Sequence, residues 1–161
     1  MTSGDPGSTS ALGGALRSNA LRLADLVDEL SPTPHAVEVG RPDHAASERE
    51  LLVSTADELD RIGGLLQQWT ATTVESLARL RRLDQQLAAA GLEVSGNRVV
   101  EPLGPSRVDP DERLRSRERL QELLNRVTSF RSKELARLAR ELEASRLNLA
   151  RVSDVARSER R

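Results

Sequence analysis

Apolar residues recur every three or four positions along most of this chain. Between residues 47 and 90 they form two columns that stay in phase. The first column holds Leu52, Leu59, Leu66, Thr73, Leu80 and Leu87, and the second holds Thr55, Ile62, Trp69, Ser76, Leu83 and Ala90. Two columns in phase predict one long helix whose seam packs against other helices.

A shorter helix is predicted at residues 10–30, where apolar residues follow the same spacing from Leu12 to Leu30. Ser10 is a suitable N-cap. Residues 1–9 are mostly Gly, Ser, Thr, Asp and Pro, so we expect a flexible tail there. The prolines and glycine after this helix predict a loop.

The long helix is predicted over residues 44–90, with its start near Asp43 or Ser47. Ser47 and Glu50 have the spacing of a capping box, and Gly91 can close the other end in a left-handed conformation. Residues 92–101 then contain two short segments that flank a turn at Gly96-Asn97, which predicts a small β-hairpin.

A third helix is predicted over residues 110–157. Asp109 at the N-cap, Pro110 at the first helical position and Glu112 two residues later together predict its start. The five-residue step from Phe130 to Leu135 interrupts the heptad, so we expect the helix to be straighter or locally unwound at that point.

These elements predict an all-α fold, an elongated antiparallel bundle of a short and two long helices with a small hairpin, in a single domain over residues 10–161. The short connection between the long helices makes them antiparallel neighbours. We expect Leu80 opposite Leu120, Leu59 opposite Leu142 or Glu141, and Trp69 beside Phe130 or Arg131. We also expect Gly13-Gly14 to lie level with Gly63-Gly64 and to allow a close approach of the helices.

The half of the bundle beyond residue 65 has two helices where the other half has three. Its apolar stripe therefore lacks cover, and we expect a second chain to bury it. The candidate interface residues are Trp69, Val74, Leu77, Leu80, Leu124, Val127 and Phe130. Trp69 suits either internal packing or a partner contact, and both interpretations remain open.

Candidate chemistry is sparse. The chain has no Cys, and its two histidines, His35 and His44, flank a Pro-rich loop without the spacing of a metal site. The glycine pairs lack the residues of a phosphate-binding loop, and no Ser-His-Asp arrangement can be argued. We expect no enzymatic activity and no cofactor.

Arginine accounts for almost all of the basic residues. Arg79, Arg81 and Arg82, with the run Arg113, Arg115, Arg117 and Arg119, could contact phosphates. The net charge is −1, however, and the chain has no aromatic stacking platform. Nucleic-acid binding is therefore the third hypothesis, after partner binding and after a coiled-coil scaffold or adaptor.

The sequence also resembles the helical proteins of actinobacterial type VII (ESX-type) secretion systems, over about residues 4–105. The matching segments are Gly4-Asp5-Pro6, Leu12-Gly13-Gly14-Ala15-Leu16, Leu23, Leu59-Asp60-Arg61-Ile62-Gly63, Trp69 and the stretch from Ala90 to Pro102. The resemblance implies a helical hairpin, often dimeric, that is a secretion-associated substrate or companion. Its partners would be a second copy, a related helical protein or the secretion machinery.

Two features of that family are missing. Trp69 is followed by Thr70 and Ala71 instead of a Trp-x-Gly turn, and the chain has no Tyr for the C-terminal export motif. Export would need a partner that carries the motif, or the protein is a cytosolic relative or chaperone. The N-terminus has no Sec signal and no stretch predicts a membrane span, so we expect synthesis in the cytoplasm.

Overall fold

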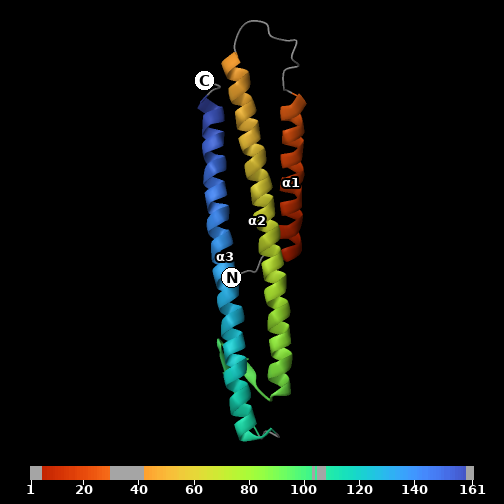
Figure 1. Ribbon diagram of the computed structural model, residues 1–161, viewed down its shortest axis with the longest axis vertical. Coiled ribbons are helices and arrows are strands. Elements are labelled where there is room, and N and C mark those ends of the chain that lie inside the picture. Colours follow the sequence, from red (N-terminus) through yellow and green to blue (C-terminus); the bar gives the residue numbers. More distant parts are fainter. Residues whose placement is uncertain (1–4, 30–41, 103, 105–107, 159–161) are drawn as a thin grey trace. The chain divides into compact units, whose positions relative to one another are not determined.

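The computed structural model describes residues 5–29, 42–102, 104 and 108–158, with the backbone alone for residues 42–45. Its helices are α1 (Pro6–Glu29), α2 (Pro42–Ala89) and α3 (Pro110–Ser158) (Figure 1). A two-stranded antiparallel sheet, β1 (Glu93–Ser95) and β2 (Arg98–Val100), lies between α2 and α3 in sequence. The predicted all-α class with a small hairpin is confirmed.

Helix α1 begins one turn earlier than predicted. Asp5, not Ser10, is its N-cap, because the Asp5 carboxylate accepts hydrogen bonds from the amides of Ser8 (3.0 Å) and Gly7 (3.3 Å). Pro6 occupies the first helical position. The hydrogen bond from the Ser8 hydroxyl and those from the two amides lower the pKa of Asp5 from its ordinary value of 3.8. The predicted flexible tail therefore overlaps the first turn of a helix.

The start of α3 is confirmed, and α2 begins next to Asp43, one of its two predicted starts. The Asp109 carboxylate accepts from the amides of Asp111 (3.1 Å) and Glu112 (3.2 Å). Helix α2 already begins at Pro42, so Ser47 and its capping-box partner lie inside the helix and the predicted cap is wrong.

The end of α2 is closed as predicted. Gly91 has a φ of 67°. The Leu92 amide donates to the Leu87 carbonyl (2.9 Å) and the Gly91 amide to the Ala88 carbonyl (3.1 Å), which is the hydrogen-bond pattern of a Schellman motif. Leu92 and Leu87 also meet in one hydrophobic cluster, so the motif directs the chain from the helix into β1.

The chain divides into two compact units. Unit 1 comprises Met1–Thr70 and Arg137–Arg161, and unit 2 comprises Ala71–Ala136. Helices α2 and α3 contribute to both units, whereas α1 belongs to unit 1 and the hairpin to unit 2.

In unit 1, α1 packs closely against α2 at two glycines. A Cβ added to Gly13 would lie 2.9 Å from the Gly63 carbonyl oxygen, and one added to Gly63 would lie 2.7 Å from the Gly13 carbonyl oxygen. Gly14 and Gly64 meet nothing within 4 Å. The predicted approach is thus confirmed for one glycine of each pair. Arg17 reinforces it with an ion pair to Asp60 (2.8 Å).

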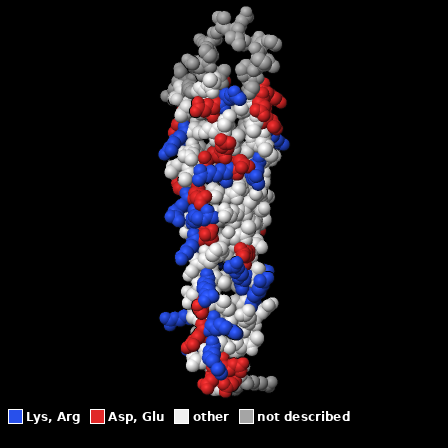
Figure 2. All heavy atoms as spheres, in the orientation of Figure 1, with Lys and Arg blue, Asp and Glu red and all other residues white. Residues whose placement is uncertain are grey.

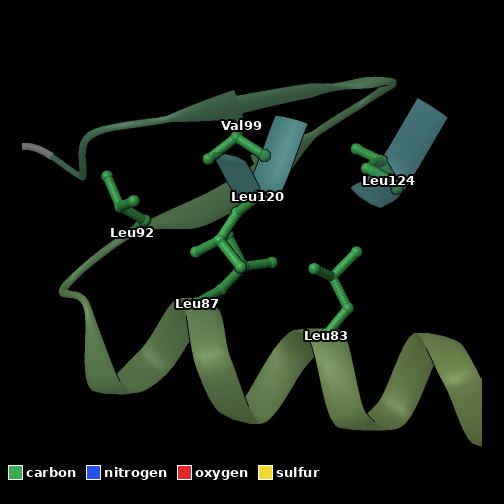
Figure 3. Close-up of a cluster of buried hydrophobic side chains, with 6 residues drawn as sticks. All are labelled: Leu83, Leu87, Leu92, Val99, Leu120 and Leu124. Atoms are coloured by element: carbon green, nitrogen blue, oxygen red, sulfur yellow. The ribbon is translucent and has the colours of Figure 1, made fainter. Parts of the chain in front are cut away.

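The core of unit 2 joins α2, the hairpin and α3 (Figure 3). Its members are Leu83, Leu87, Leu92, Val99, Leu120 and Leu124, each at most 5% exposed. Figure 3 shows Leu87 pointing toward Leu120 and Leu83 pointing toward Leu124. The two helices are antiparallel here, as predicted.

The predicted register of α2 against α3 is wrong by about one heptad in each unit. In unit 2, Leu87 faces Leu120 where Leu80 was expected. In unit 1, the Asn148 side chain donates to Glu58 (3.3 Å), although the predicted register pairs this part of α2 with residues 141–142. The apolar columns repeat every seven residues, so shifting by one heptad leaves the pattern matched.

The predicted local unwinding of α3 near Phe130 is wrong. Helix α3 is continuous, and its partly or fully buried positions pass through Val127, Arg131, Glu134 and Leu138 at steps of three and four. Phe130 lies beside this stripe and is 43% exposed. Arg131 and Glu134 are partly buried although they are charged, and a pattern of apolar residues alone could not identify them.

Candidate partner-binding surface

One face of α2 in unit 2 presents apolar side chains to solvent. Val74 is 53% exposed and Leu77 is 39% exposed. Arg81 follows Leu77 by four residues and is also exposed. Because residues three and four apart share a helix face, these three side chains form one surface, which we call the α2 patch.

Along α2 itself, Val74 and Leu77 repeat the heptad positions of two residues that contact α1 in unit 1. The α1 contacts on α2 include Gln67, which accepts from Arg17 (3.3 Å), and Thr70, whose hydroxyl donates to the Pro6 carbonyl (3.4 Å). Val74 follows Gln67 by seven residues and Leu77 follows Thr70 by seven. A seven-residue step nearly preserves the direction of a helical side chain, so a helix-binding face continues into the patch.

The inward face of α2 beside the patch is polar. Thr73 is 5% exposed and Ser76 is 1% exposed, and the Thr73 hydroxyl has no hydrogen-bond partner among the described residues. Small hydroxyl side chains bury much less apolar area than leucine does. This stretch of unit 2 therefore gains less from internal packing than the leucine cluster does.

Phe130 belongs to a different surface. The guanidinium of Arg79 lies 5.4 Å from the centre of its ring, in a cation–π arrangement. Arg79 lies two residues from Leu77 on α2, a rotation of about 200° around the helix. Phe130 therefore neighbours the side of α2 that faces away from the patch, and its ring is paired with Arg79 where Trp69 was expected.

The remaining predicted interface residues contribute less. Leu124 is 4% exposed inside the core of unit 2, so its predicted place on an open surface is wrong. Leu80 packs against the same core and Val127 is partly buried. Trp69 is partly buried in unit 1. Only Val74 and Leu77 are both exposed and on one face.

The arginines do not form one continuous basic surface on the face seen in Figure 2, where Lys and Arg alternate with Asp and Glu. Arg79 pairs with Glu75 (2.5 Å) and Arg113 with Glu101 (3.5 Å). Several arginines have no ion-pair partner within the described parts of the chain, among them Arg81, Arg82, Arg117 and Arg119.

Other kinds of site find no support in the described residues. No group of three or more His, Asp or Glu side chains there could hold a metal ion. His35 and the side chain of His44 lie outside the described residues. Within the same ranges, no helix combines the length and apolar character that crossing a bilayer demands.

No protein-family model, curated protein or solved structure matches this chain.

Proposed function

We propose that this chain is a non-enzymatic helical protein that binds a partner through the α2 patch. The observation that supports this most strongly is the continuity of the patch with the face of α2 on which α1 packs. That face accepts an antiparallel helix in unit 1, and its apolar residues continue in unit 2 as Val74 and Leu77. A helix of a second chain is the occupant that fits such a surface.

The proposed partner is a second copy of the same chain. Each copy carries the same patch, so a twofold pair would bury both patches at once. Fully burying a Val or Leu side chain contributes roughly 1.5 to 3 kcal/mol, and two such residues per copy supply a favourable term to set against the entropy of association.

A light-scattering measurement tests this proposal. We expect the mass of a dimer at micromolar concentration for the unmodified chain and a shift to the monomer for Val74→Glu with Leu77→Glu. The matched control is Leu21→Glu, because Leu21 is 67% exposed on α1, outside the patch. A monomeric mass for the unmodified chain, or a dimer that survives the double substitution, would count against the α2 patch.

We also propose that the protein is associated with type VII secretion, as a substrate or companion. The support is the sequence resemblance over about residues 4–105, including Gly4-Asp5-Pro6 and the stretch from Ala90 to Pro102. A neighbouring gene for a helical protein with a Trp-x-Gly turn would favour this assignment over a scaffold unrelated to secretion.

A further inference from the structure

A groove of about 630 Å³ lies in unit 2 between β2 and α3, and it is partly open to solvent. Its lining residues are Asn97, Arg98, Val99, Val100, Arg117, Glu118, Gln121 and Asn125. None of them belongs to the α2 patch, so the groove is a separate surface.

Gln121 holds the two walls of the groove together. Its side-chain oxygen accepts from the Val99 amide (2.7 Å), and its side-chain nitrogen donates to the Asn97 carbonyl (3.1 Å). The same nitrogen donates to the side-chain oxygen of Asn125 (3.0 Å). These bonds occupy the acceptor end of the Asn125 amide and leave its NH₂ group as the free end.

The groove therefore presents mainly hydrogen-bond donors. Arg98 and Arg117 are exposed residues, and neither has an ion-pair partner among the described residues. The free NH₂ group of Asn125 adds a neutral donor. Glu118 supplies the one carboxylate of the lining, so the two arginines leave the groove with a net positive charge.

We infer that this groove binds an acidic peptide segment in an extended conformation, with Arg98 and Arg117 pairing with its carboxylates. Arginine pairs well with carboxylates because its planar fork can donate two parallel hydrogen bonds. Small-molecule sites enclose most of their ligand, whereas this groove is partly open to solvent, which leaves room for a peptide that extends beyond it. The inference does not depend on the proposed function of the α2 patch.

Fluorescence anisotropy with a fluorescein-labelled peptide of four Glu-Val repeats tests the inference. We expect saturable binding that weakens as salt is added. Arg98→Gln with Arg117→Gln should weaken it about tenfold. Arg119→Gln is the matched control and should change affinity by less than about twofold, because Arg119 is about 200° around α3 from Arg117 and does not line the groove.

A gain of binding distinguishes the groove from a general charge effect or a folding defect. Glu118→Gln removes the carboxylate that repels an acidic ligand, so affinity for the peptide should rise about twofold to threefold. Melting temperatures of all variants are compared by circular dichroism, and we expect them to agree.

Several outcomes would overturn the inference. These are no saturable binding at millimolar peptide, equal binding of a peptide with Gln in place of Glu, an equal loss for Arg119→Gln, and no gain for Glu118→Gln. Sodium phosphate is added as a competitor at matched ionic strength. If it displaces the peptide at concentrations where sodium chloride does not, the groove selects phosphate and the peptide assignment is wrong.

Discussion

At the scale of single residues, the contact between α1 and α2 depends on two glycines that have no room for a side chain. The added methyl group of Gly63→Ala would meet the Gly13 carbonyl at 2.7 Å and also the Arg17 side chain. A backbone carbonyl cannot rotate away as a side chain can, so the helices would have to separate. Gly64, the next residue, faces open space.

This difference between neighbours gives a paired prediction. Gly63→Ala should lower the free energy of unfolding by roughly 1 to 3 kcal/mol through overpacking. Gly64→Ala should raise it by roughly 0.5 to 1 kcal/mol, because alanine favours the helix more than glycine does. Urea unfolding of the two variants measures both values. Equal shifts of the same sign would show that the α1–α2 contact is not as close as described.

At the scale of elements, local signals in the sequence located the start of α3, the end of α2 and the hairpin. Asp109-Pro110 and Gly91 were identified because their effects depend on adjacent residues alone. Asp5-Pro6 carries the same Asp-Pro signal, but the Gly and Ser residues around it favoured a tail. The register between α2 and α3 could not be read in this way, since a heptad pattern matches itself after every seven residues.

The position of the hairpin on α3 depends on Gln121, which an apolar pattern also cannot identify. Gln121→Met keeps much of the side-chain volume but leaves the Val99 amide without its acceptor, at a residue only 5% exposed. An unsatisfied buried donor costs roughly 1 to 3 kcal/mol. We expect a loss of stability in that range, and faster hydrogen exchange at the Val99 amide.

Gln86→Met is the control for this substitution, because Gln86 is an exposed glutamine on α2 within the same unit. Gln86→Met should change the free energy of unfolding by less than about 0.5 kcal/mol. If Gln121→Met unfolds at the same urea concentration as this control, the hairpin is held by its apolar contacts alone and the hydrogen bonds of Gln121 add nothing measurable.

At the scale of the whole molecule, the sequence predicted an under-covered apolar stripe, and Val74 and Leu77 are indeed exposed. The sequence could not separate these two residues from Leu124 and Phe130. Which apolar side chains are covered depends on the register between α2 and α3, and the sequence does not determine that register. The groove beside the hairpin was likewise missed, since its donors come from β2 and α3 and converge only after folding.

A distance between labels on two copies of the chain most directly tests whether the α2 patch joins them. The chain has no Cys, so Ala78→Cys places a single nitroxide label beside Leu77 at an exposed position. Packed helices lie about 8 to 10 Å apart, so we predict an interchain label distance of roughly 10 to 35 Å by pulsed electron paramagnetic resonance. The distance should disappear when Val74→Glu and Leu77→Glu are added. An absence of any interchain distance at about 100 micromolar protein, or a distance that persists in the triple variant, would contradict the account.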